Sequence, residues 1–305
     1  PKAKTTVVEV RPWEFQAVQQ DLMLRSTAFP ELEARFGVKM LPEIIFAENR
    51  LNFVCPLQGA PIPPGPDAPE GRPGPRLGIA RLRVSAFDAI EDAARFYKTP
   101  DFDAVRDCVA VPAAASWDKF RDKMQSFDPS IDWAFRSRYT GTVDFTPIDA
   151  TVPSPLPRKE VPAGSDDPRL QIDWDMLKRT DVPIRFYSAL DLFEDDLHDG
   201  GLSRLSVKTR AMDTCFFVLL RHVVRVDGTI LIVRDVRVFH SMASSPPTIV
   251  FEECEKQVTL QERIDACPNA DVEQLRREMA RDEECLPHMR TSFERRTYVE
   301  LPTTL

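Results

Sequence analysis

The sequence lacks the motifs that mark the most common enzyme classes. It contains no G-x-G-x-x-G, no G-x-x-x-x-G-K-[ST], no H-E-x-x-H and no G-x-S-x-G. Those patterns supply phosphate-binding glycines, zinc-binding histidines or a nucleophilic serine. Their absence argues against the nucleotide-binding, zinc-protease and serine-hydrolase families, although it leaves room for an unusual active site.

Cysteine and histidine are scarce and scattered. The six cysteines include no C-x-x-C pair. In a chain of 305 residues without a secretion signal, such thiols are expected to be reduced. The four histidines are too far apart in the sequence to form a zinc signature. We therefore expect neither a disulfide framework nor a cofactor.

Long hydrophobic runs and an excess of basic residues are also missing. Arg221 and Arg225 interrupt the most apolar stretch, CFFVLLRHVVRV, well short of the roughly 20 residues that a membrane span needs. The first residues, PKAKTTVVEV, show no signal-peptide segment. The net charge of −8 and the pI of about 5.2 are unlike those of nucleic-acid-binding proteins. We expect a soluble protein of the cytoplasm, and also of the nucleus, that binds neither membranes nor nucleic acid.

The sequence does contain many alternating segments rich in β-branched residues. The clearest is the segment 214–240, in which two such runs flank Asp227-Gly228. Asp-Gly favours a two-residue type I′ turn, which would place Arg221 opposite Arg234. Like charges directly opposed are unfavourable. A carboxylate or a partner must satisfy them, or a bulge must shift the register.

Strand patterns outnumber helical patterns, and the two do not alternate regularly. Further strands are expected within 5–11, 43–53, 130–143 and 247–260. Amphipathic helices are expected within 85–97, 113–124 and 270–284. The sequence therefore predicts an α+β fold of mainly antiparallel sheets, arranged in two layers or a sandwich, with flanking helices.

Two proline-rich segments interrupt these patterns. Residues 56–76 contain eight prolines, and residues 146–169 contain six. Because proline lacks an amide donor and fixes φ, neither segment is expected to form a strand ladder or a helix. We interpret both as loops or disordered insertions within a single domain spanning 1–305. The first would lengthen the loop of a β-hairpin.

An acidic cluster precedes another alternating strand. Its members are Glu194, Asp195, Asp196, His198 and Asp199. One interpretation is a metal-dependent hydrolase in which Asp235 of the hairpin joins Asp196, His198 and Asp199. The second is an acidic turn that caps a helix ending at the following glycines. The third is a surface that another protein recognises.

Several ordered motifs carry a resemblance to a known family. They are RPWEF, LPEIIFAENRL, IDWAFRSRYTGT, LFEDDLHDGGLSRLSVKTRAM, CFFVLLRHVVRVDG and RDVRVFH. In this order they resemble the TOR signalling pathway regulator-like family, TIPRL, over roughly 11–55, 76–90, 129–145 and 170–256. The two proline-rich segments fall where the family's pattern has short connections, so they look like lineage-specific insertions.

The resemblance implies a regulator that is not an enzyme. Such a protein binds the catalytic subunit of type 2A protein phosphatases, including its C-terminal tail, and acts in TOR signalling. The resemblance also implies association with the alpha-4 type of phosphatase-binding protein. The implied mechanism is steric and conformational: the protein competes with scaffold assembly or holds the phosphatase in a form of low activity.

The resemblance also places the expected phosphatase contacts. They fall on Asp88 in SAFDAI, on Ile172 in QIDW and on Val233 in ILIVRD. From their charge near the end of the hairpin we add Arg234, Asp235 and Arg237. Arginines there can bind an acidic segment or a terminal carboxylate through paired hydrogen bonds. The acidic cluster 194–199 would then shape a recognition surface.

A third hypothesis is a passive adaptor. In that case the proline-rich segments would recruit proline-binding domains of the SH3 or WW type.

Overall fold

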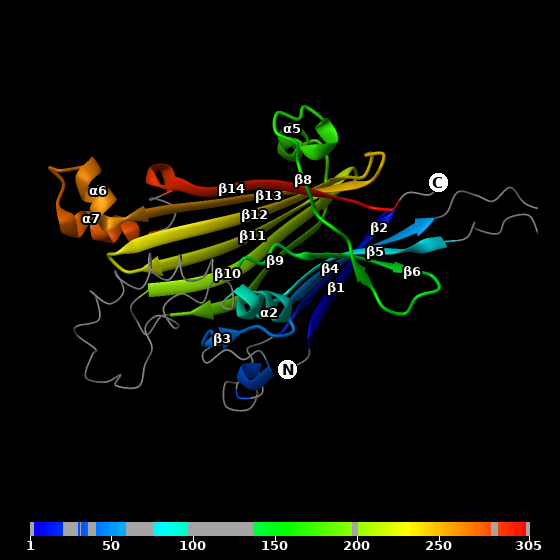
Figure 1. Ribbon diagram of the computed structural model, residues 1–305, viewed down its shortest axis with the longest axis horizontal. Coiled ribbons are helices and arrows are strands. Elements are labelled where there is room, and N and C mark those ends of the chain that lie inside the picture. Colours follow the sequence, from blue (N-terminus) through cyan, green and yellow to red (C-terminus); the bar gives the residue numbers. More distant parts are fainter. Residues whose placement is uncertain are drawn as a thin grey trace, which may run out of the picture.

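The protein folds into two antiparallel β-sheets with few helices, as the computed structural model shows (Figure 1). The structure describes residues 3–20, 30, 32–35, 41–58, 76–96, 137–196, 201–281 and 286–302. The predicted fold class is confirmed. The predicted helix within 113–124 lies outside the described residues.

The first sheet has six strands in the order β1-β2-β4-β5-β6-β7. They are β1 (Lys4–Val10), β2 (Trp13–Gln19), β4 (Arg50–Gln58), β5 (Arg76–Ser85), β6 (Thr142–Pro147) and β7 (Ser154–Pro155). The β4 and β5 strands pair antiparallel, with Gln58 near Arg76. This arrangement confirms that the first proline-rich segment connects the strands of a hairpin. Residues 59–75 themselves lie outside the described part of the chain.

The second sheet has eight strands in the order β3-β9-β10-β11-β12-β13-β14-β8. They are β3 (Ile44–Ile45), β8 (Lys159–Glu160), β9 (Ile184–Asp195), β10 (Gly201–Met212), β11 (Cys215–Val226), β12 (Ile230–Ser241), β13 (Thr248–Thr259) and β14 (Arg290–Glu300). The five strands from β9 to β13 have twelve residues each. They form the long slab in the left half of Figure 1.

The main hydrophobic core lies between the two sheets. Successive side chains of a strand point to opposite faces, so each sheet turns one set of apolar residues inward. Phe15 and Phe53 of the first sheet meet Phe216 of the second at ring-centroid distances of 5.7 and 5.2 Å. Such aromatic contacts stabilise a core beyond the burial of area alone. The other face of the long sheet is thereby left to carry polar side chains.

The helices lie at the periphery of the sheets. They are α2 (Ala86–Phe96), η3 (Pro168–Leu170), α5 (Trp174–Lys178), α6 (Leu260–Ala266), α7 (Val272–Met279) and η4 (Leu286–His288). The helices α2 and α7 confirm the predictions for 85–97 and 270–284. On α7, Glu273 pairs with Arg276 at 3.7 Å. Among the described residues, no helix has the length and hydropathy to cross a membrane.

The β11–β12 hairpin has a longer turn than the sequence predicts. The first strand pair is Val226 with Ile230, and the Thr229 N–H donates to the Val226 carbonyl at 3.0 Å. Gly228 has a φ of 64°, which glycine adopts without steric cost. The turn therefore contains three residues, 227–229, and the predicted two-residue turn is wrong.

The shifted register removes the opposed arginines. Arg221 lies opposite Asp235 instead of Arg234. A one-residue shift and a carboxylate thus together resolve the like-charge pair that the two-residue turn would have created.

The second proline-rich segment is ordered where the sequence predicts a loop. Its β7 strand pairs with β6 at one edge of the first sheet, and its β8 strand pairs with β14 at the edge of the second. The helix η3 follows, with Asp167 as its N-cap. The prediction that 146–169 forms neither strand nor helix is wrong. Proline is tolerated on edge strands and in the first turn of a helix, where no amide donor is needed.

Candidate interaction surface

The outer face of the eight-stranded sheet, opposite the core, carries a band of charged side chains. We call this band the charged strip. It comprises Arg204, Lys208, Arg221, Asp235, Arg237 and Glu252. Helix α5 packs over one end of the strands, against Met212, Cys215 and Phe239. The other end is covered by α7 and η4, which pack against Val223 and Val233. The strip therefore lies between α5 at one end and α7 with η4 at the other.

Ion pairs connect neighbouring strands along the strip. Arg221 donates two hydrogen bonds to the Asp235 carboxylate, at 2.7 and 2.8 Å. Arg237 bridges Asp235 and Glu252 at 3.8 and 3.9 Å. Burial raises the pKa of Glu252, although Arg237 and Arg296 counteract that effect. The ion-paired part of the strip is thus a ladder of alternating charges on three strands, β11, β12 and β13.

The guanidinium of Arg237 has longer polar contacts than that of Arg221. Its guanidinium lies 5.6 Å from the centre of the Trp174 ring, and 32% of its side chain is exposed. Within the described part of the chain, this guanidinium makes two long ion pairs and no hydrogen bond. A planar guanidinium over an aromatic ring, with its N–H groups available, is suited to a carboxylate ligand.

A pocket of about 310 Å³ adjoins the strip. Its polar lining residues are Asp191, Arg204, Ser206, Lys208 and Arg221. Val233 and Leu286 contribute apolar walls. Because Arg221 is paired with Asp235, Arg204 and Lys208 against Asp191 leave the lining with a small excess of positive charge, although the whole chain is acidic.

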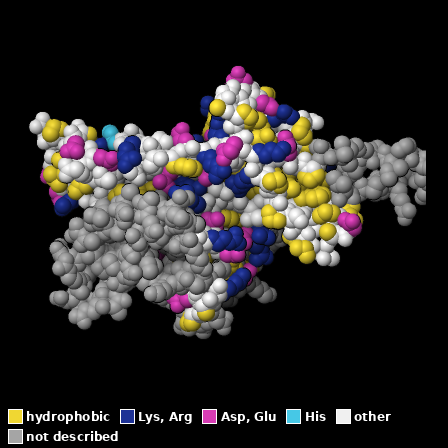
Figure 2. Space-filling model, viewed as in Figure 1, with side chains coloured by type: hydrophobic (Ala, Val, Ile, Leu, Met, Phe, Trp, Pro, Cys, Tyr) yellow, Lys and Arg dark blue, Asp and Glu magenta, His cyan; other side chains and the backbone are white. Residues whose placement is uncertain are grey.

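The acidic and basic side chains elsewhere do not segregate. Figure 2 shows Lys and Arg interspersed with Asp and Glu on the described part of the face drawn. The same view shows apolar side chains gathered around β6 and the loop that follows it, where Ile148 and Val152 are 61% and 71% exposed. The described part of this face shows no broad basic patch of the kind that nucleic-acid binding uses.

The structure places the predicted contact residues at different depths. Asp235 and Arg237 lie on the strip, and Val233 lies on the same face but is only 4% exposed. Ile172 is 5% exposed and packs beneath α5 with Leu177. The helix α5 begins at its N-cap Asp173, whose carboxylate accepts the Met176 N–H at 2.8 Å. Ile172 therefore supports one border of the strip from below.

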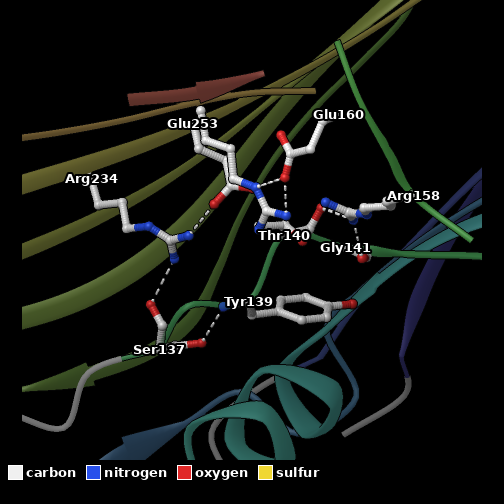
Figure 3. Close-up of polar contacts among 9 residues, drawn as sticks. Ser137, Tyr139, Thr140, Gly141, Arg158, Glu160, Arg234 and Glu253 are labelled. Atoms are coloured by element: carbon white, nitrogen blue, oxygen red, sulfur yellow. Dashed lines mark hydrogen bonds and ion pairs between the residues drawn. The ribbon is translucent and has the colours of Figure 1, made fainter. Parts of the chain in front are cut away.

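Arg234 points to the opposite face of the sheet and is buried. Its Nη2 donates to Glu253 at 2.5 Å, and its Nη1 donates to the Ser137 carbonyl at 3.1 Å (Figure 3). Burial lowers the pKa of Arg234, while Glu253 opposes that shift. Strand alternation separates residue 234 from 235 and 237. We therefore leave Arg234 out of the candidate surface.

The same inner region ties the second proline-rich segment to the sheets. Arg158 donates to the carbonyls of Thr140 and Gly141 at 3.1 and 2.8 Å (Figure 3). Its guanidinium lies 3.7 Å from the centre of the Phe251 ring. Burial lowers the pKa of Arg158 to about 10, so the side chain stays charged at neutral pH.

Asp88 lies in the first turn of α2 and contacts the first sheet. Its carboxylate accepts from Arg83 Nε at 2.7 Å, and the Tyr139 hydroxyl lies 3.4 Å away. The Asp88 N–H donates to Ser85 Oγ at 3.1 Å, so Ser85 supplies the cap. The described contacts of Asp88 do not involve the strip.

The acidic cluster occupies the end of β9. Glu194 and Asp195 are the last residues of that strand, and Asp196 follows it. His198 and Asp199 lie outside the described residues. A strand, not a helix, precedes the cluster, so its interpretation as a helix cap is wrong.

The structure adds a carboxylate that the sequence did not suggest. Ligand atoms of Glu43, Asp195 and Asp196 lie within 4.8 Å of one another. Glu43 comes into place because β3, which starts at the next residue, pairs with β9. Asp235 is on β12, separated from β9 by β10 and β11, and is bound to Arg221. The four-residue metal site of the hydrolase hypothesis is therefore not assembled from the residues described.

Comparison with known proteins identifies the family. Residues 80–264, which include α2 and the strands of the strip, match the TIP41-like family. The chain belongs to this family. It is 30% identical to a TIP41-like protein of Arabidopsis thaliana over 83% of this chain and 78% of that protein. It is 28% identical to a human TIP41-like protein over 75% of this chain and 69% of that protein.

A further relative carries a functional name. The Schizosaccharomyces pombe protein called type 2A phosphatase activator tip41 is 25% identical over 57% of this chain and 61% of that protein. The TIPRL resemblance drawn from the sequence motifs is thus confirmed at the level of the family.

Proposed function

We propose that this TIP41-like protein is a non-catalytic regulator that binds the catalytic subunit of type 2A protein phosphatases. Membership of the family and the name of the fission-yeast relative support this proposal. The absence of common catalytic motifs from the sequence is in line with it. The protein acts by binding the phosphatase and does not itself catalyse a reaction.

The charged strip is the part of the surface that we assign to this partner. The observation that carries the assignment is Arg237, whose guanidinium makes no hydrogen bond to a described residue and lies 5.6 Å from the centre of the Trp174 ring. The neighbouring basic pocket supplies Arg204 and Lys208. Hydrogen bonds to charged groups are about twice as strong as neutral ones, so such a site favours an anionic segment.

The ligand of the strip is the C-terminal tail of the phosphatase, bound through acidic side chains or its terminal carboxylate. Capture of the tail changes which other proteins reach the phosphatase, so the effect is competition with scaffold assembly or retention of a form of low activity. Asp88, Ile172 and Val233 belong to the same proposed interface. Of these, Ile172 and Val233 act from buried positions by shaping its borders.

The cellular setting follows from the same proposal. The protein works in TOR signalling, in the cytoplasm and nucleus, and associates with an alpha-4-type phosphatase-binding protein directly or through the phosphatase. Glu194, Asp195 and Asp196 form a second, acidic contact area near β9, to which His198 and Asp199 also belong.

Calorimetric titration with a purified type 2A catalytic subunit tests the proposal. The subunit is used intact and with its C-terminal tail removed. Tight binding that weakens without the tail is the expected result. Binding that ignores the tail would move the interface to the body of the phosphatase. No binding to either form would refute the proposal.

Metal analysis separates this function from the hydrolase alternative. Protein purified without chelator is expected to contain no stoichiometric transition metal. A stoichiometric metal that disappears in the Asp196→Ala, His198→Ala double variant would favour the hydrolase. The adaptor alternative rests on the proline-rich segments, of which residues 59–75 lie outside the described part of the chain. Loss of a partner on deletion of 56–76 would support it.

A further inference from the structure

A second pocket lies at the opposite end of the molecule from the helices α6 and α7. It has a volume of about 590 Å³, within the range of small-molecule sites. The β1–β2 turn, β4, the end of β12 and the residue after β14 form its walls. Its apolar lining includes Pro12, Trp13, Leu57, Met242, Pro247 and Leu301. None of the residues predicted to bind the phosphatase lines it.

The interior of this pocket holds one fixed hydrogen-bond acceptor. His240 lines the pocket and is 3% exposed. Its Nδ1 lies 2.8 Å from the Thr248 carbonyl, which can only accept, so Nδ1 carries the proton. Burial lowers the pKa of His240 to about 4, so the ring is neutral at pH 7. Its Nε2 is therefore a lone-pair acceptor.

The imidazole is held in position by aromatic neighbours. Trp13 meets it edge-on at a centroid distance of 5.2 Å, and Phe216 lies at 5.1 Å. Trp13 is 1% exposed and belongs to the main core. The acceptor thus stands on the rigid part of the fold, as a specific binding site requires.

The other polar groups of the pocket do not compete for a ligand donor. The Cys55 thiol is buried, and burial raises its pKa to about 11, so it stays protonated. Arg11 and Glu9 line the pocket from exposed positions and pair with each other at 3.2 Å. Among the described lining residues, His240 therefore supplies a neutral side-chain nitrogen as a hydrogen-bond acceptor.

We propose that this pocket binds a small planar aromatic molecule that carries a ring N–H or O–H group, with indole as the simplest representative. The ring packs against Trp13, Leu57 and Met242. The ring N–H donates to His240 Nε2. A purely apolar molecule of the same size leaves that acceptor without a partner, and burying an unpaired polar group is unfavourable.

Methyl-detected NMR of the full chain tests this inference with two ligands. Indole and 1-methylindole differ in the ring N–H and little else. Indole is expected to shift the methyl signals of Leu57, Met242 and Leu301 first and to bind about tenfold more tightly than 1-methylindole. The methyl groups of Val233 and Leu286, which line the other pocket, serve as the internal control.

Protein variants provide a second, independent test of the proposed site. In His240→Phe the acceptor is lost, so indole and 1-methylindole are expected to bind equally. The exposed His288→Phe variant is the matched control and is expected to keep the preference. If His240→Phe does not fold, the two-ligand comparison on the unaltered protein still decides. Equal affinity for the two ligands on that protein, or no shift of the three pocket methyl signals, would overturn the proposal.

Discussion

Arg221 and Asp235 face each other across β11 and β12 and are joined by two hydrogen bonds of 2.7 and 2.8 Å. Asp235 is 9% exposed, so this partner supplies hydrogen bonds to a carboxylate that has little contact with water. The pair also fixes the orientation of the carboxylate that Arg237 approaches at 3.8 Å. Stability and the shape of the charged strip are therefore linked at this one position.

Removing the charge of Asp235 tests that link. Asp235→Asn leaves Arg221 with a weaker acceptor in a partly buried site, and the free energy of unfolding should fall by about 1–3 kcal/mol. Urea unfolding measures the loss. Asp213→Asn is the control, because Asp213 forms a similar paired contact with Arg185 at an exposed site and should have a smaller effect. Equal losses in the two variants would contradict the account.

Substitutions at Ser85 and Asp88 are expected to have different effects on stability and on phosphatase binding. Ser85→Ala removes the cap of α2 and should reduce stability by about 1 kcal/mol without affecting phosphatase affinity. Asp88→Leu should weaken phosphatase binding, since the family resemblance places a contact there. Its effect on stability should be smaller, because Arg83 is 40% exposed and remains hydrated. A thermal scan and a calorimetric titration of each variant decide the matter.

Because His240 is buried and neutral, the free energy of unfolding is expected to fall in acid. Its pKa is about 4 in the folded protein against 6.5 in a free side chain. The unfolded chain therefore takes up this proton first as the pH falls. At about 1.36 kcal/mol per pH unit, the stability lost between pH 6.5 and pH 4 is about 3 kcal/mol.

The difference between the unaltered protein and His240→Gln isolates this contribution. Urea unfolding from pH 7 to pH 4 measures the free energy of unfolding of both proteins. As the pH falls, this free energy should decrease more in the unaltered protein than in the variant. His288→Gln is the control, because His288 is exposed. If the difference between the two free energies of unfolding does not depend on pH, His240 is not kept neutral by the fold.

Arg158 is expected to hold the second proline-rich segment in place. Arg158→Met removes the donor for the carbonyls of Thr140 and Gly141 and should reduce stability by about 2 kcal/mol. The amide of Val161, which donates to the Arg296 carbonyl, should exchange with solvent faster. Arg185→Met, which alters an exposed arginine of β9 away from this segment, is the control. Unchanged exchange at Val161 in Arg158→Met would show that the segment is held by other contacts.

The sequence predicts the long strands well because their alternation is local. The hairpin 214–240, the helix at 85–97 and the hairpin around the first proline-rich segment all follow from nearby residues. The turn at 227–229 could not be predicted with the same accuracy, because the register that places Arg221 opposite Asp235 is visible only in the folded sheet. A two-residue turn would have satisfied the local pattern equally well.

The candidate sites depend more on tertiary structure. Residues 233, 235 and 237 share a parity, which places them on one face, but both faces of the hairpin are apolar enough to hide which one is outside. Glu43 joins the acidic cluster only through β3, and His240 meets Trp13 only through the packing of the two sheets. No spacing in the sequence signals either contact.

The most direct test of the central claim is the affinity of Arg237→Ala for the intact type 2A catalytic subunit, measured by calorimetric titration beside the unaltered protein. Loss of charge-assisted hydrogen bonds should raise the Kd about tenfold or more. Arg11→Ala, which alters an arginine 90% exposed on the first sheet, should leave the Kd unchanged. Equal affinity of Arg237→Ala and the unaltered protein would show that the charged strip is not the phosphatase-binding surface.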